Sequence, residues 1–225
     1  MIRPDHVVAI MAKAPIAGQA KTRLIPRLGA EHAAMLYQEM LLDTIELVAE
    51  ALNGSGALSI VCPTSADRTA LKQIVPSAIQ VVADETGSLM GGLGYGLTYH
   101  ITQGYDHVIL LDGDSPTLPV RYLQSAFDAL GSADVVLGPT MDGGYYLIGA
   151  CQPQPALFKW EHLDSTTICA QTHVRAEALG LRVRVLPSWY DVDTSEDLQR
   201  LVDDLHLHPG GAPHTREFLM RYGHM

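Results

Sequence analysis

The sequence predicts an α/β fold, a three-layer α/β/α sandwich around a mainly parallel, Rossmann-like sheet. Two observations predict it. Short apolar runs without polar alternation are typical of strands that are buried on both faces. Longer segments with apolar residues at helical spacing alternate with these runs along the chain. With 225 residues, 47% of them hydrophobic, the chain is long enough for one large domain with a full core.

The strands are predicted from apolar runs that end at glycine, proline or polar residues. The run at 108–111 is the clearest, because four apolar residues lead directly into two carboxylates and a proline. Together these patterns place strands at 7–12, 57–62, 79–83, 108–111, 133–139, 145–149 and 182–186.

The helices are predicted from apolar residues at a spacing of three or four and from residues that favour helix ends. Ser65 and Pro119 are expected at the start of their helices, and Thr194 or Ser195 at the start of a later one. A cap cluster at 164–167 is expected to open another. These patterns place helices at 29–52, 65–75, up to about 103, 119–130, up to about 179, and after 195.

The chain is expected to form one domain over residues 1–205. Residues 206–225 then read as a linker rich in glycine, proline and histidine, followed by a short helix packed on the same domain. The histidines of this segment lack metal-binding spacing, so we interpret them as tail composition.

Composition excludes several classes of function. A net charge of −10 argues against nucleic acids and anionic membranes as main partners, but it leaves nucleotides open. The three cysteines form no CxxC pair, which excludes a cysteine zinc site and suits a reducing compartment. No apolar run resembles a signal peptide or approaches membrane-spanning length. We therefore expect a cytoplasmic protein, and the sequence leaves its oligomeric state open.

The turn Asp112-Gly113-Asp114 follows the predicted strand at 108–111. Open α/β sheets bind their ligands at this end of the strands. Two carboxylates beside a glycine suggest a hard divalent cation, Mg²⁺ or Mn²⁺, and the phosphates that it would hold. The alternative is an aspartate-rich turn that caps the next helix.

The loop at 13–24 carries three cations, Lys13, Lys21 and Arg23, among glycine, alanine and proline residues. Backbone amides, an arginine fork and lysine charges together suit a triphosphate or pyrophosphate. The loop matches neither the Walker A pattern nor GxGxxG. Its cations would otherwise be solvated surface charges.

Three further stretches carry candidate residues. The segment at 84–96 contains five glycines, which predict either a close approach to a base or ribose or a mobile loop. Asp142 precedes Gly143 and Gly144, either as a plain β-turn or as a carboxylate that faces a substrate hydroxyl. Near the end of the chain, Asp191 and Asp193 stand one residue apart without a structural explanation.

The ordered set of these motifs resembles the nucleotide-diphospho-sugar transferase superfamily of GT-A type over roughly residues 7–205. The stretches that carry the resemblance are 21–24 (KTRL), the aspartate turn at 112–114 and the DVDTSEDL stretch at 191–198. The DGGYYLIG stretch at 142–149 resembles an uncharacterised bacterial branch. That branch is similar to guanylyltransferases of molybdenum-cofactor and deazaflavin-cofactor biosynthesis.

The resemblance implies roles for individual residues. Contacts to the nucleotide are expected from Lys13, Ala14, Gly18, Lys21, Arg23, Gly87 and Asp112. The catalytic residues are expected to be Lys21, Arg23 and Asp114. The metal ligands are expected to be Asp114 and Asp193, with Asp112 as a further ligand. The acceptor is expected to contact Asp142, Gly143, Gly144 and Tyr145.

Two departures from this branch stand out. Relatives usually have a glycine at the position of Asp112, and they commonly carry an arginine near residues 91–93, where this chain has Gly91, Gly92 and Leu93.

The function expected from the sequence is that of a metal-dependent transferase with a nucleotide donor. Nucleotidyl transfer from an NTP to a small phosphorylated acceptor, with release of pyrophosphate, is favoured because the basic loop suits a triphosphate. The alternative is a glycosyltransferase with a nucleotide-sugar donor, since Asp112 and Asp114 resemble a DxD motif. A non-catalytic nucleotide-binding module, motivated by the missing arginine, is the second alternative.

Overall fold

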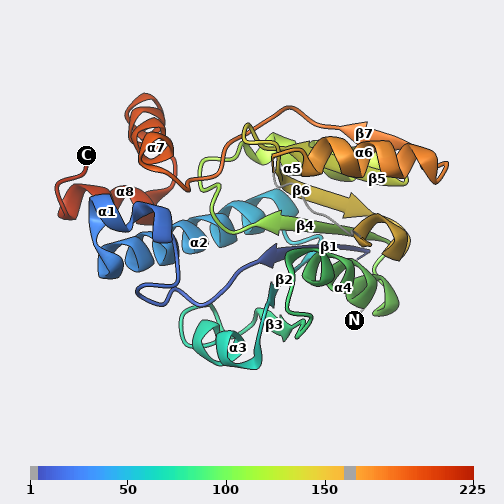
Figure 1. Cartoon of the computed structure of the whole chain (residues 1–225), viewed down its shortest axis with the longest axis horizontal. Helices are drawn as coiled ribbons and strands as arrows, with labels where there is room; N and C mark the ends of the chain where they lie inside the picture. The colour runs from blue at the N-terminus through green and yellow to red at the C-terminus, as the bar shows by residue number, and fades with distance from the viewer. Residues whose placement is uncertain (1–4, 160–165) are drawn as a thin grey trace.

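The computed structural model describes residues 5–159 and 166–225 (Figure 1). Seven strands form one sheet in the order β3-β2-β1-β4-β6-β5-β7, and only β6 runs antiparallel to its neighbours. This is the mainly parallel sheet that the sequence predicts. The strands are β1 (His6–Met11), β2 (Ala57–Cys62), β3 (Gln80–Ala83), β4 (His107–Asp112), β5 (Val135–Pro139), β6 (Tyr145–Ala150) and β7 (Val183–Val185).

Helices follow most strands, as the alternating pattern predicts. Two of them, α1 and η1, are single turns in the basic loop region, and η2 is a second short 3₁₀ helix. The helices are η1 (Thr22–Leu24), α1 (Ile25–Leu28), α2 (Ala30–Leu52), α3 (Ser65–Leu71), α4 (Leu89–Thr102), α5 (Val120–Leu130), η2 (Pro155–Phe158), α6 (Ile168–Ala178), α7 (Ser195–Leu207) and α8 (Pro213–Arg221).

Alternate residues of the strands face opposite layers, because successive side chains of a strand point to opposite faces. Val8 and Ile10 of β1 pack in a core with α2, α3 and α5. Val7 and Ala9 pack in a second core with α4, η2 and α6. The apolar runs therefore lack polar alternation because both faces of the sheet are covered.

A third core lies beyond the end of the sheet, where α1, α7 and α8 surround the N-terminal half of α2 (Figure 1). Leu36 and Met40 of α2 are fully buried there, together with Leu201 of α7 and Leu219 of α8. This cluster anchors the second half of the basic loop, because Ala20 and Leu24 belong to it. None of the helices in the described parts of the chain has the length and apolar character needed to cross a bilayer.

The helix starts differ in detail from the prediction. Thr64, rather than Ser65, caps α3 by accepting from the Asp67 amide. Pro119 is the N-cap residue of α5 and lies one residue before its first turn. Thr194 caps α7 in a reciprocal capping box with Asp197. Of the cluster expected to open α6, residues 164 and 165 lie outside the described residues.

Four of the five glycines in the segment 84–96 lie in the first turns of α4 rather than in a loop, and Gly87 precedes the helix. Ser88 caps the helix by accepting from the Gly91 amide. A Cβ on Gly92 would lie 2.8 Å from Asp84 Oδ2, and one on Gly96 would lie 3.1 Å from Leu110. The missing side chains therefore let α4 pack closely against the sheet and the 84–88 loop.

Candidate functional site

Two adjoining cavities lie at the edge of the sheet where β1 and β4 end. The larger has a volume of about 620 Å³ and is lined by three cations, Lys13, Lys21 and Arg23. The smaller, about 220 Å³, has no lysine or arginine among its described lining residues. Asp114 lines both. We call them the basic cavity and the acidic cavity.

The basic cavity gathers residues that are far apart in the sequence. The loop after β1 supplies the cations, Gly87 comes from the loop before α4, and Asp193 comes from the segment before α7. The structure therefore brings together six of the sequence-predicted site residues around one hollow. These are Lys13, Lys21, Arg23, Gly87, Asp114 and Asp193.

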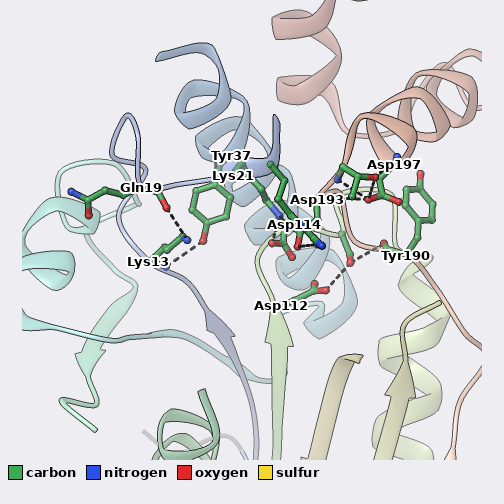
Figure 2. A network of polar contacts seen from close by, with 12 residues as sticks. Lys13, Gln19, Lys21, Tyr37, Asp112, Asp114, Tyr190, Asp193 and Asp197 are labelled. Atoms are coloured by element: carbon green, nitrogen blue, oxygen red, sulfur yellow. Dashed lines mark hydrogen bonds and ion pairs between the residues drawn. The ribbon is translucent and has the colours of Figure 1, made fainter. Parts of the chain in front are cut away.

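Lys21 lies at the centre of this group (Figure 2). Its Nζ atom donates to Asp114 Oδ2 at 2.5 Å and to Asp193 Oδ1 at 2.6 Å. The side chain is 4% exposed, and the backbone holds the left-handed conformation at φ 46°. Lys21, which is expected to contact the nucleotide phosphates, therefore bonds the two expected metal ligands.

The electrostatics of this contact favour the charged forms of its members. Burial alone would lower the pKa of Lys21, but the Asp114 and Asp193 carboxylates outweigh it and raise the pKa above its usual range. Burial acts to raise the pKa of Asp193, and the Lys21 ammonium reverses this and lowers it. Arg23 lies farther out, with Nη1 3.9 Å from Asp193 Oδ2 and a side chain that is 69% exposed.

Other polar groups of the basic loop form hydrogen bonds within the protein. Lys13 donates from Nζ to the Gln19 carbonyl at 3.0 Å, and its backbone amide donates to the Tyr37 hydroxyl (Figure 2). The Ala14 amide donates to Asp67 Oδ1 at 2.8 Å. Ala14 and Gly18, both expected to contact the nucleotide, do not line either cavity.

The acidic cavity is lined by four carboxylates, those of Asp112, Asp114, Asp142 and Asp191, over an apolar interior. Two of them end or follow β4, one lies in the turn before β6, and Asp191 precedes α7. The strands β4, β5 and β7 end at this edge of the sheet and the antiparallel strand β6 begins there, and this topology explains why the four meet.

Only one of the two carboxylate oxygens of Asp112 has a hydrogen-bond partner among the described residues. Its Oδ2 atom accepts from Ser115 Oγ at 2.8 Å, and Ser115 in turn donates to the Tyr190 carbonyl (Figure 2). Its Oδ1 atom is buried and has no hydrogen-bond partner in the described structure. Burial and the Asp114 charge raise the pKa of Asp112 well above its usual value. Since neither Asp112 nor Asp114 caps α5, the helix-cap interpretation of this turn is wrong.

Asp191 is the main site residue that the sequence left unassigned. Burial, with the charges of Asp114, Asp193 and Asp142, raises its pKa to about 7. Its position two residues before Asp193 was the only signal in the sequence, and that signal did not indicate where its side chain points. The structure directs Asp191 to the acidic cavity and Asp193 to the basic one.

The turn before β6 supplies the remaining expected acceptor contacts. Asp142 Oδ1 accepts from Thr140 Oγ1 at 2.5 Å and from the Gly144 amide at 3.1 Å. Asp142, Gly144 and Tyr145 line the acidic cavity, whereas Gly143 does not. Gly143 has φ +98°, and a Cβ there would lie 1.8 Å from the Thr166 carbonyl oxygen. Its requirement for glycine is therefore structural.

The three expected metal ligands do not converge on one point. Among the described residues, the group whose donor atoms lie within 4.8 Å of one another is Asp43, Glu46 and His214, where α2 meets α8. Asp43 there accepts from the backbone amides of His214 and Thr215 at the start of α8. Asp43 thus caps the first turn of α8, and His214 Nε2 pairs with Glu46 Oε1 at 3.0 Å. At the candidate site, Lys21 Nζ fills the space between Asp114 and Asp193.

Two more lining residues were missed by sequence reasoning. Tyr37 of α2 lies under Lys21, with its ring centroid 5.8 Å from Nζ. Asp84, the residue after β3, also lines the basic cavity. Its Oδ1 atom accepts from the Thr86 amide. Tyr37 falls in a helical pattern typical of a core face, so the sequence offered no signal for it.

The fold and this paired site define the class of the protein, the nucleotidyltransferase superfamily with a GT-A-like fold. The structure is similar to the crystal structure of a candidate nucleotide-diphospho-sugar transferase from Desulfovibrio desulfuricans G20. The TM-score is 0.84 at 27% sequence identity, with 97% of this chain and 98% of that chain covered. This confirms the fold and the superfamily expected from the sequence motifs.

Within this class, the chain belongs to the family described as "Uncharacterized protein conserved in bacteria (DUF2064)", whose model matches residues 47–161. It is also similar to two proteins named phosphoenolpyruvate guanylyltransferase. The one from Conexibacter woesei is 28% identical over 207 residues, which cover 89% of each chain. The one from Chloroflexus aggregans is 27% identical over 186 residues, which cover 80% of this chain and 90% of the relative.

Proposed function

We propose that this protein transfers a nucleoside monophosphate from an NTP to a small acceptor and releases pyrophosphate. One observation carries the proposal: a basic cavity and an acidic cavity meet at a shared carboxylate, Asp114. Such a pair gives the donor and the acceptor separate places on either side of one reacting centre. Holding two reactants in this way accounts for much of the rate in transfer reactions.

The basic cavity is the proposed donor site. Its volume of about 620 Å³ is in the range of small-molecule sites, and its cations suit a triphosphate. Arg23, which is 69% exposed, is free to turn toward phosphate oxygens. GTP is the first donor to test, since both named relatives are guanylyltransferases.

The residues present fit a divalent cation in their donor chemistry. Carboxylate oxygens are the ligands that Mg²⁺ and Mn²⁺ prefer, and the buried Oδ1 atom of Asp112 lacks a partner. Asp114 and Asp193, which both bond the single Lys21 Nζ atom, would hold the ion, and Asp112, which lines the acidic cavity beside Asp191, would join them after a rearrangement of the site. When bound, such an ion neutralises charge that develops on the pyrophosphate leaving group. Lys21 has to leave the two carboxylates for this, and its release toward the phosphates follows from their negative charge.

The acidic cavity is the proposed acceptor site. A small phosphorylated acceptor is the expectation from the sequence, and the names of the two relatives, which include phosphoenolpyruvate, agree with it. The lining of the cavity, with four carboxylates and an apolar wall, supports a different class of acceptor.

Glycosyl transfer from a nucleotide sugar is less well supported. That chemistry was suggested by the resemblance of Asp112 and Asp114 to a DxD pair, which would act together on the donor. In the structure, Asp112 lines the acidic cavity and only Asp114 reaches the basic one. The two carboxylates therefore meet in the acidic cavity, and only one of them reaches the proposed donor site.

The test combines binding with turnover. Calorimetry with each NTP, in the presence and absence of Mg²⁺, measures the donor site, and pyrophosphate release with a panel of acceptors measures transfer. We expect metal-dependent binding of one NTP and acceptor-dependent release of pyrophosphate. Hydrolysis of GDP- or UDP-sugars without pyrophosphate release would instead indicate the glycosyltransferase. Tight nucleotide binding without turnover on any acceptor would indicate a non-catalytic module.

A further inference from the structure

The composition of the acidic cavity restricts the charge of its ligand. Four carboxylates line it, and its described lining contains no lysine or arginine. The segment 160–165, which lies outside the described residues, also contains no lysine or arginine in the sequence. The cations of the site are instead gathered in the neighbouring basic cavity. A phosphate group would therefore be attracted to the donor cavity and repelled from this one.

A single cation shared with the donor does not change this. Asp114 lines both cavities, so an ion held there serves the donor phosphates as well. Asp142 and Asp191 lie on the acidic side only and stay negatively charged or protonated. Neither state supplies a positive charge that would balance a second anion. Arg200 contacts Met141 next to Asp142, but it stacks on the Tyr190 ring at 4.2 Å and does not line the cavity.

The interior of the acidic cavity is apolar and small. Leu93, Leu110, Ile148 and Ile168 are buried core residues that also form its wall. Its volume of about 220 Å³ holds a compact group rather than a second nucleotide. An apolar body against this wall places the polar end of the ligand toward the carboxylates that line the rest of the cavity.

Asp142 is held where it can accept from such a polar end. Its Oδ1 atom is fixed by Thr140 and by the Gly144 amide. The turn itself is fixed because Gly143 packs against the Thr166 backbone with no space for a side chain. A carboxylate in this position accepts a hydrogen bond from a hydroxyl and lacks a donor for a phosphate.

We propose that the acceptor is a compact alcohol with an apolar body and without a phosphate or carboxylate group. This inference rests on the proposed nucleotidyl transfer. The hydroxyl oxygen attacks the α-phosphorus and forms a new P–O bond, while the bond to the β-phosphate oxygen breaks and its electron pair leaves on pyrophosphate. The hydroxyl proton passes to the Asp142 carboxylate and then to water. The product is a phosphodiester of the nucleoside monophosphate.

Matched pairs of acceptors test this directly. Each pair contains an alcohol and its phosphate ester, such as isopentenol with isopentenyl phosphate and choline with phosphocholine, and phosphoenolpyruvate is added as a further anion. The enzyme is incubated with GTP, Mg²⁺ and equimolar members of each pair, and the GMP conjugates are measured by mass spectrometry. We expect conjugates of at least one alcohol to exceed those of its phosphate ester by tenfold or more.

Two variants sharpen the result without relying on a single fold-sensitive change. Leu89 is 59% exposed and lines both cavities, so Leu89→Lys adds a cation at the mouth and is expected to shift the preference toward the phosphate ester by tenfold or more. Leu207→Lys, at a remote position that is 75% exposed, is the matched control and is expected to change nothing. Asp142→Asn is expected to lower transfer to the alcohol by at least tenfold.

The outcomes separate this inference from the proposed function. Preferential conjugation of the phosphate esters or of phosphoenolpyruvate overturns the acceptor class and leaves nucleotidyl transfer standing. Metal-dependent GTP binding by calorimetry, without a conjugate of any alcohol, also overturns it. If no NTP binds at all, the proposed function itself fails.

Discussion

The two cavities of the site differ in how the charge of their buried carboxylates is balanced. In the basic cavity, the buried carboxylates Asp114 and Asp193 are neutralised by the Lys21 ammonium. In the acidic cavity, neither Asp112 nor Asp191 forms an ion pair within the described parts of the chain, and burial with the nearby carboxylates raises the pKa of both. The comparison teaches that one side of the site is closed by an internal ion pair, whereas the other is left with unmet negative charge. Asp114 joins the two.

The largest expected effect comes from removing this shared residue. Asp114→Asn takes a carboxylate from both cavities at once and leaves Lys21 with Asp193 as its remaining partner. We expect metal-dependent GTP binding to be lost and turnover to fall by about 10²–10³-fold, which is typical when a charge-stabilising group is removed from an active site. Calorimetry and pyrophosphate release measure the two. Normal metal-dependent binding by this variant would show that Asp114 is not a ligand.

The next prediction concerns the ion pair that closes the basic cavity. Lys21→Met removes the ammonium that occupies Asp114 and Asp193, so the affinity for Mn²⁺ alone is expected to rise by about tenfold or more, because two close carboxylates lose their counter-charge. The affinity for GTP is expected to fall, since a phosphate-binding cation is lost. Titration with Mn²⁺, followed by electron paramagnetic resonance, measures the first effect.

Lys13→Met is the matched control for this experiment. Lys13 lines the same cavity but bonds the Gln19 carbonyl rather than a carboxylate. We expect unchanged affinity for Mn²⁺ alone and weaker binding of GTP. A Lys21 variant with the same Mn²⁺ affinity as the wild type would contradict the role of Lys21 as an internal counter-ion.

A third prediction addresses the rigid turn of the acidic cavity. Gly143→Ala is expected to destabilise the protein by about 2–4 kcal/mol, because the left-handed backbone and the contact with the Thr166 carbonyl both exclude a side chain. Gly180→Ala, which has φ +75° but open space around it, is the control, with a cost of about 1 kcal/mol. Denaturant unfolding measures both. Equal costs would show that the turn can shift.

The smallest expected effect is the pH dependence of the acidic cavity. The pKa of Asp191 is raised from 3.8 to about 7, so its protonated form stabilises the folded state below pH 4, and this stabilisation is lost as the pH rises to about 7. Asp191→Asn removes this loss. We expect the variant to gain about 1–3 kcal/mol relative to the wild type between pH 4 and pH 8.

Unfolding in guanidinium chloride at a series of pH values measures this difference. The high salt of that denaturant screens exposed charges, so a parallel urea series keeps the interaction visible. A constant difference in the free energy of unfolding across this range would indicate that Asp191 titrates normally.

The sequence by itself determined the fold and most of the residues that meet at the site. Apolar runs without alternation indicated strands covered on both faces, and the two cores on either side of β1 confirm this. The basic loop after β1 and the turn after β4 lie at one edge of the sheet because parallel strands end together. These features depend on local pattern and on topology, which a sequence records directly.

Only the tertiary structure decided how these residues face one another. The sequence could not show that Lys21 bonds Asp114 and Asp193, because that contact joins residues 93 and 172 positions away. It could not direct Asp191 and Asp193 to different cavities, since no regular strand or helix fixes side-chain direction in that segment. The need for glycine in α4 was likewise visible only in the structure, where Asp84 and Leu110 pack against the helix. Distances between remote side chains are set by packing, and this is why the division into a neutralised and an unneutralised cavity emerged from the structure.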